Sequence, residues 1–269
     1  MQDAWFGNPL VARMAAMDVI SRYPRLASNP PEWLVSDTPM RCPYLSGQTA
    51  RLPLRLPVRP LRPDEFSHRL AEGDRRQGLL LYRPSCPTCH ACEAIRIDVE
   101  TFEPNRTQRR IFRRGEATIH TQIGAPTVTA EKVALYNRHK IERALLIGNE
   151  LVDASSYEQF LVETCTDTIE LTYHHRGRLL GVAITDRASD ALSAVYCFYD
   201  ARDARLSPGT YSILKQIALC RLWGLRYLYL GLYVADCTPM SYKAGYLPHE
   251  RLIGGAWRRV GKITDTRTG

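Results

Sequence analysis

Three cysteines at regular spacing are the first residues of this sequence whose type and order indicate chemistry. Cys86, Cys89 and Cys92 follow one another in a single short loop. Thiolates at this spacing bind a tetrahedral zinc ion or an iron–sulfur cluster, and either centre needs a fourth ligand. Cys42, in a proline-rich segment, is the candidate for that ligand. We therefore predict one metal centre, zinc or iron–sulfur, with idle or buried thiols as the alternative.

Five arginines between residues 106 and 114 form the second set. On a helix, their spacings of three and four residues place the guanidinium groups on one face, and the nearest carboxylates in sequence are Glu103 and Glu116. Guanidinium groups suit phosphate oxygens, and each neutralised phosphate releases counterions. The pattern therefore favours contact with an RNA backbone over a solvated helix face. The arginines are Arg106, Arg109, Arg110, Arg113 and Arg114.

The third set is near the C-terminal end, where a strand, a turn and a short helix are expected to meet. Tyr242, Lys243 and Tyr246 stand together there, but aromatic residues at helical spacing are more often packing than chemistry. The sequence has no phosphate-binding loop with lysine, no dinucleotide glycine fingerprint, no G-x-S-x-G elbow and no H-E-x-x-H pair. An activated acyl donor must therefore come from a separate molecule.

Length and composition limit the class of protein. A chain of 269 residues suits one large or two fused units, and 45% hydrophobic with 24% charged residues is typical of a globular protein. Lysine plus arginine exceed aspartate plus glutamate by 36 to 28, and this net charge of +8 slightly favours a polyanionic partner. There is no membrane-spanning apolar run and no secretory signal. We expect a cytoplasmic protein without a membrane partner.

Hydrophobic periodicity and turn residues predict the elements that position these sets. Strands are expected on both sides of the cysteine loop, and recurring prolines leave residues 42–62 extended, without central strands. The arginine helix is expected at 105–114, closed by Gly115. Further predictions are an amphipathic segment at 9–23, strands at 78–82, 94–99 and 117–123, a helix at 129–146, and a helix with a capping box of Ser155 and Glu158.

The second half of the chain changes to short alternating strands. Three of them indicate an antiparallel meander, and a helix with Ser207 as N-cap follows and stops at Gly224. The order of three strands, helix, strand, helix and strand is similar to the second part of the GNAT acyltransferase fold. The predicted strands are 169–173, 179–185, 191–198, 227–234 and 252–260, with a short helix at 239–244.

These elements predict an α+β protein with two functional parts. The first is a cysteine-rich metal-binding region, and the second is a GNAT-like acyltransferase domain with a mixed antiparallel sheet flanked by helices. The expected boundaries are an N-terminal extension at 1–41, the cysteine-rich domain at 42–128, the GNAT-like domain at 129–260 and a tail at 261–269.

Six ordered blocks of this sequence resemble the arginyl- and leucyl-tRNA-protein transferases. The resemblance runs from about Cys42 to about Trp257 and is closest to the bacterial branch that leucylates N-terminal Asp and Glu. The blocks are CPYLSG (42–47), YRPSCPTCHAC (82–92), FEPNRTQRR (102–110), SAVYCFYD (193–200), GTYSIL (209–214) and MSYK (240–243), the last followed by Tyr246 and Pro248.

The resemblance implies a reaction and its partners. It implies ribosome-independent transfer of leucine from Leu-tRNA to proteins that begin with Asp or Glu, which marks them for degradation in an N-degron pathway. It also implies an N-terminal metal-binding cysteine region and a C-terminal acyltransferase-like domain. We expect no nucleotide cofactor, because the sequence lacks a phosphate-binding loop and a dinucleotide fingerprint.

Roles for individual residues follow from this chemistry. The aminoacyl ester is already activated, so the enzyme has to align the acceptor amine, stabilise an oxyanion and supply a general base. We expect Lys243 to recognise charge on the acceptor side chain or on the tRNA 3′ end, with a structural salt bridge as the alternative. Tyr246 and His174 are further binding candidates. The candidates for the general base are Asp186, Tyr211, Tyr242 and the pair His174 and His175.

Four other functions remain open from the sequence. The donor could be Arg-tRNA, or the acceptor a small molecule or peptide in a biosynthetic pathway. An acyl-coenzyme A acetyltransferase would need a glycine-rich pyrophosphate turn, of which Ser207-Pro-Gly-Thr is a poor version. A non-catalytic, metal-stapled RNA-binding module would use the cysteines and arginines but leave the C-terminal block without a role.

Overall fold

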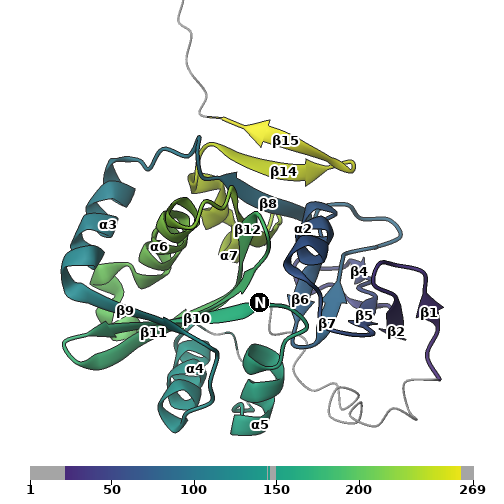
Figure 1. Cartoon of the computed structure of the whole chain (residues 1–269), viewed down its shortest axis with the longest axis horizontal. Helices are drawn as coiled ribbons and strands as arrows, with labels where there is room; N and C mark the ends of the chain where they lie inside the picture. The colour runs from purple at the N-terminus through teal and green to yellow at the C-terminus, as the bar shows by residue number, and fades with distance from the viewer. Residues whose placement is uncertain (1–21, 144, 146–149, 262–269) are drawn as a thin grey trace, which may run out of the picture.

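An eight-stranded sheet organises most of the computed structural model, which describes residues 22–143, 145 and 150–261 (Figure 1). The strand order is β15-β14-β8-β13-β12-β11-β10-β9, and only β12 and β13 pair in parallel. The α+β class and the mixed sheet are therefore confirmed. The strands are β8 (Glu93–Asp98), β9 (Ile119–Gly124), β10 (Thr168–His175), β11 (Arg178–Arg187), β12 (Ala191–Tyr199), β13 (Tyr227–Tyr233), β14 (His249–Ile253) and β15 (Ala256–Val260).

Helices cover both faces of this sheet (Figure 1). On one face α3 and α6 pack together through buried residues such as Ile111 and Ile213. On the other face α4 and α5 contribute Tyr136 and Tyr157 to a second core. None of the helices in the described ranges is long and apolar enough to cross a membrane. The helices are α3 (Arg106–Thr118), α4 (Ala130–Glu142), α5 (Ala154–Tyr157) with a π-helical turn (Glu158–Val162), and α6 (Pro208–Leu222).

A five-stranded sheet precedes the large one and corrects one prediction. Its order is β1-β2-β5-β7-β6, so β5 is a central strand, although prolines were expected to exclude one from residues 42–62. Pro57 lies at the end of β5, and the residues between it and Pro53 have backbone N–H groups. The hydrogen bonds that pair β5 with β2 and β7 can therefore form. The elements are β1 (Arg25–Leu26), β2 (Glu32–Ser36), β5 (Leu54–Pro57), β6 (Arg75–Gln77) and β7 (Leu80–Tyr82), with α2 (Pro63–Ala71) and the small pair β3 (Met40–Arg41) and β4 (Thr49–Ala50).

Gly115 lies inside α3 and does not close it, contrary to the prediction. A Cβ atom at this position would lie 2.1 Å from Cδ2 of Tyr211, because the side chain of α6 crosses the helix there. The glycine therefore permits close packing of two helices, and α3 continues to Thr118. Sequence alone could not separate this use of glycine from a helix stop.

Two further element boundaries differ from the predictions. The cap of α5 is Asp153, whose carboxylate accepts a hydrogen bond from the Ser156 amide at 2.8 Å, so the box of Ser155 and Glu158 is wrong. The strand expected at 252–260 is a hairpin, because Gly254 and Gly255 both adopt positive φ and turn the chain between β14 and β15. The amphipathic segment at 9–23 and the tail lie almost entirely outside the described residues.

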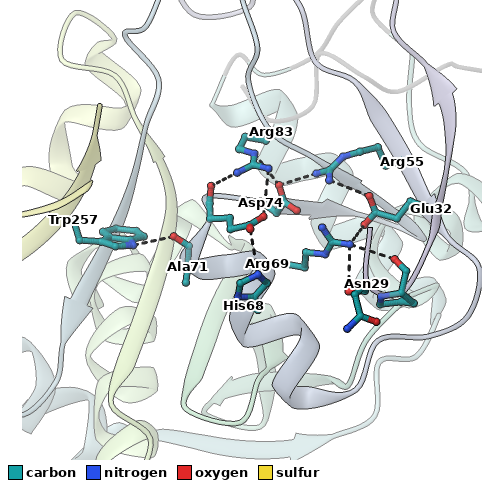
Figure 2. A network of polar contacts seen from close by, with 11 residues as sticks. Asn29, Glu32, Arg55, His68, Arg69, Ala71, Asp74, Arg83 and Trp257 are labelled. Atoms are coloured by element: carbon teal, nitrogen blue, oxygen red, sulfur yellow. Dashed lines mark hydrogen bonds and ion pairs between the residues drawn. The ribbon is translucent and has the colours of Figure 1, made fainter. Parts of the chain in front are cut away.

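Buried ion pairs hold the five-stranded sheet and α2 together (Figure 2). Glu32 lies between Arg55 and Arg69, at 3.0 and 2.9 Å. Asp74 lies between Arg55 and Arg83, at 2.7 and 3.2 Å, and the side chains of both acids are fully buried. Each carboxylate has two guanidinium partners, which offsets the cost of removing charge from water.

Side-chain contacts join the two parts of the structure. The Trp257 indole of β15 donates to the carbonyl of Ala71 at the end of α2 (Figure 2). Arg76 of β6 forms an ion pair with Asp186 of β11 at 2.7 Å, and both side chains have no exposed surface. The eight-stranded sheet also takes β8 and β9 from before residue 128, and the boundary there stays a prediction.

Candidate functional site

A cavity of about 650 Å³ opens in the eight-stranded sheet where β12 and β13 separate. The strands pair only from Ala191 opposite Tyr227 to Ser193 opposite Tyr229. Beyond these pairs the register shifts within β12 and again around Gly231 of β13, whose φ of 86° favours glycine. Because bulges bend strands, these shifts account for the gap. We call it the central cavity.

Three helical segments and the separated strands enclose the central cavity. They are α4, α6 and the stretch after β13, which holds α7 (Thr238–Ser241) and the 3₁₀ turn η4 (Tyr242–Gly245). Arg143 and Tyr242 are exposed at the rim, whereas Lys243 is buried. None of the lining residues in the described ranges is acidic. The cavity wall is therefore neutral or cationic.

Lys243 is the buried cation of this wall. Its side chain donates a hydrogen bond to the carbonyl of Leu232 in β13, and it forms no ion pair within the part of the chain that the structure describes. Burial and the nearby charge of Arg75 lower the pKa of Lys243 to about 7, while Cys237 acts in the opposite direction. The lysine is poised to change its charge near neutral pH, and a bound anion would favour its charged form.

Two buried polar side chains of α6, Ser212 and Gln216, line the cavity and bond to neighbouring strands. The Ser212 hydroxyl accepts hydrogen bonds from Tyr173 at 2.9 Å and from Gln216 at 3.1 Å. Thr185 donates to Gln216 at 3.0 Å. Sequence reasoning missed Ser212 and Gln216, although two polar residues four apart on an otherwise apolar helix face are a usable signal. His139 on α4 and Arg143, the C-cap of that helix, show the same spacing and also line the cavity.

The structure brings together only part of the predicted site. Tyr242, Lys243 and Tyr246 line the central cavity as a group. Tyr211 lies outside it, with its hydroxyl against Glu116 at 2.7 Å. His174 is also not part of the lining, since it lies on β10 opposite His120 of β9. The C-terminal block, whose role spacing left open, therefore forms one wall of the central cavity.

Asp186 is enclosed in the protein and does not line the cavity. Besides its ion pair with Arg76, it accepts a hydrogen bond from Thr168 at 2.7 Å, and it has no exposed surface. A general base must reach the proton it removes directly or through one water molecule. The position of Asp186 favours a structural role in joining the two sheets.

The arginine face of α3 is exposed and without carboxylate partners. Asn105 caps the helix, with its side chain accepting from the Gln108 amide at 2.9 Å. Glu116 is engaged by Lys215 at 2.9 Å. None of the five arginines forms an ion pair within residues 22–143, 145 and 150–261. The face is therefore a free cationic surface, as the helix prediction requires.

The four predicted metal ligands gather near one another without forming a complete site. Burial and then the charges of Cys86, Cys42 and Cys89 raise the pKa of Cys92 to about 12. Backbone amides point at two sulfurs: Leu45 N lies 3.4 Å from Cys42 Sγ, and Arg51 N lies 3.5 Å from Cys86 Sγ. In the described ranges, no three Cys, His, Asp or Glu side chains stand close enough to hold a metal ion.

Comparison with known proteins gives the family. Residues 131–253 match the model of the arginine-tRNA-protein transferase C terminus, and residues 40–110 match that of its N terminus. These segments contain the cavity wall and the cysteine loop. The chain belongs to the arginine-tRNA-protein transferase family. It is 40% identical over 222 residues to the aspartate/glutamate leucyltransferase of Chromobacterium violaceum, which covers 82% of this chain and 91% of that protein.

A second relative is similar to this chain over nearly the same length. The aspartate/glutamate leucyltransferase of Halorhodospira halophila is 39% identical over 219 residues, covering 81% of this chain and 92% of that protein. Among solved structures, L-PGS from Bacillus licheniformis is similar at a TM-score of 0.43 and 13% identity, covering 63% of this chain and 58% of that one. FemX is similar at a TM-score of 0.40 and 12% identity, covering 62% and 59%.

Proposed function

We propose that this member of the arginine-tRNA-protein transferase family transfers leucine from Leu-tRNA to the N-terminal Asp or Glu of acceptor proteins. The names of its two relatives support the donor and the acceptor. The single structural observation that carries the acceptor class is the central cavity, which has a buried lysine and no acidic lining residue in the described ranges. Such a wall suits an acidic side chain. A cytoplasmic N-degron pathway is the setting that this reaction suits.

The cavity also suits the mechanics of aminoacyl transfer. The tRNA ester is already activated, so the protein gains rate by holding ester and amine together and by donating hydrogen bonds to the developing oxyanion. Tyr242 and Tyr246 present phenol groups to the cavity, and burial raises the pKa of Tyr246 to about 12, which keeps it a hydrogen-bond donor. The strand and helix order from β10 onward supports a GNAT-like arrangement for this half.

Purified protein is expected to transfer leucine from Leu-tRNA to peptides that begin with Asp or Glu, without ATP once the tRNA is charged. The ester supplies the driving force. In the assay, Leu-, Arg- and Phe-tRNA are each mixed with peptides that differ only in the first residue, which is Asp, Glu, Lys or Ala. The amount of labelled amino acid joined to each peptide is then measured. Transfer from Arg-tRNA alone would assign the arginyl donor, and activity only with acetyl-coenzyme A would refute the proposal.

We propose further that Cys42, Cys86, Cys89 and Cys92 bind one metal centre, zinc or iron–sulfur, that organises the N-terminal part. The donor set fits such a centre in its chemistry: burial and the charges of Cys86, Cys42 and Cys89 raise the pKa of Cys92, and a cation would relieve the repulsion between these groups as thiolates. Amide groups directed at Cys42 and Cys86 would stabilise charge on those sulfurs. The bound centre would supply cross-linking, and the bond-making residues remain those of the central cavity.

Replacing Cys86 or Cys89 by serine is expected to reduce bound metal from roughly one centre per chain to near none, because three thiolates hold either centre poorly. Elemental analysis of protein purified without oxygen measures this, and limited proteolysis should cut residues 40–110 before the second half unfolds. Cys220→Ala, a buried thiol on α6, is the matched control and should keep its metal. Absence of stoichiometric metal from the unaltered protein would refute the site.

A further inference from the structure

Two buried cations lie in and behind the wall of the central cavity. Arg75 of β6 is 3% exposed, and Lys243 of η4 is 4% exposed. They come from opposite parts of the chain, yet they are close enough for the charge of Arg75 to lower the pKa of Lys243. Arg75 reaches the cavity wall from behind, since its Nη2 atom donates to the carbonyl of Ala194 at 3.4 Å.

Neither cation has a carboxylate of its own in the described part of the chain. Arg75 forms no ion pair there, and its Nε and Nη1 atoms are buried without a hydrogen-bond partner. The carboxylate whose charge acts on it is Asp186, which is already bonded to Arg76 and Thr168. Buried charges without partners are costly, so an anion that enters from outside would stabilise the charged forms of both side chains.

The size and depth of the site select the anion. Lys243 is reached through the cavity, whose rim carries the exposed residues Arg143 and Tyr242. A tRNA phosphodiester carries a ribose on each side, so it would have to bring the nucleotide chain into the cavity to reach Lys243. A carboxylate on a one- or two-carbon stem is small enough to reach the interior, and it would occupy the two N–H groups of Lys243 that the Leu232 carbonyl leaves available.

We infer that Lys243 binds the side-chain carboxylate of the acceptor's first residue, and that Arg75 is a positioning residue that sustains the positive potential behind it. This inference rests on the proposed function for its acceptor. The remaining titratable groups that face the cavity are His139 of α4, Arg143 just after it, Tyr196, Cys197 and Tyr199 of β12, Tyr242 and Tyr246, with Cys237 just before α7. None of these lining groups is a carboxylate.

Peptides that cannot react test the carboxylate site separately from catalysis. A succinyl-peptide keeps the Asp carboxylate and lacks the α-amine, and a succinamoyl-peptide is its neutral isostere. Calorimetry should show the unaltered protein binding the succinyl form roughly 10- to 100-fold more tightly. Because binding needs protonated Lys243, the affinity should be constant below pH 7 and fall toward about tenfold per pH unit above it.

Three variants complete the experiment. Lys243→Met should remove the preference for the succinyl form and the preference for Asp- over Asn-peptides in transfer. Lys243→Arg should keep the preference and lose its decline above pH 7, since arginine stays charged. Lys215→Met, on the surface of α6, is the matched control and should change neither. Equal binding of the two peptides by unaltered protein, or an unchanged preference in Lys243→Met, overturns the inference. Succinyl selectivity without any leucine transfer overturns only the proposed function.

Discussion

Replacing Asp186 by asparagine is expected to lower the free energy of unfolding by about 3–5 kcal/mol, because the change leaves the guanidinium of Arg76 buried without a counter-charge. Arg76 also donates to the carbonyls of Gly78 and Glu163, so the charge cannot move to solvent. The loss should appear as a lower midpoint in urea unfolding, and it should loosen the attachment of the five-stranded sheet. Transfer activity should fall mainly through the folded fraction.

Two comparisons isolate the buried pair. The double variant Asp186→Asn with Arg76→Met removes both charges. Its loss of unfolding free energy should therefore be clearly less than the sum of the losses in the two single variants. Asp167→Asn is the matched control: it breaks the neighbouring pair with Arg187, whose side chains are 49% and 36% exposed, and should cost less than about 1 kcal/mol. A fully stable but inactive Asp186→Asn protein would instead support Asp186 as the general base.

We propose that the arginine face of α3 contacts tRNA phosphates, and its neutralisation should produce the second large effect. Changing Arg109, Arg110 and Arg113 to glutamine is expected to weaken tRNA binding roughly 10²- to 10³-fold near 0.1 M salt. The slope of log affinity against log salt should fall by about two to three units, since each lost phosphate contact removes about one. Fluorescence anisotropy with labelled tRNA over a salt series measures both.

The control for this experiment has the same net charge. Arg22, Arg25 and Arg62 are exposed residues of the N-terminal part, and β1 and α3 lie at opposite ends of the molecule in Figure 1. Changing these three to glutamine removes as much charge and should leave the salt slope nearly unchanged. If both triple variants weaken binding equally, tRNA responds to overall charge, and α3 is a solvated helix.

Local sequence patterns were sufficient to predict those elements whose structure depends on a single segment of the chain. The meander β10 to β12 and the helix α6 were predicted because alternating apolar residues and Pro208 after Ser207 specify them within a few positions. Ser207 even occupies the expected N-cap position, although its side chain makes no capping hydrogen bond and its φ is 54°. The grouping of Tyr242, Lys243 and Tyr246 could likewise be found from sequence.

The features that the sequence did not predict depend on contacts between residues far apart in the chain. Asp186 could be taken for a base because its partner, Arg76, lies 110 residues away and is invisible to local reasoning. Gly115 could be taken for a helix stop for the same reason, since Tyr211 comes from another helix. The central cavity depends on how far two strands stay paired, which no periodicity records. Residues that line a cavity and residues that pack in a core show the same hydrophobic pattern in the sequence.

The short strand β6 places two consecutive arginines in different surroundings. Successive side chains of a strand point to opposite sides, so Arg76 meets the carboxylate of β11 while Arg75 reaches the wall between β12 and β13. Residues 40–110 and 131–253 are recognised as separate halves, but the second half would lose a charge beside its lysine if the first were exchanged. A chimaera of two relatives must therefore inherit this dipeptide and the segment after β13 that carries Lys243 from a single parent.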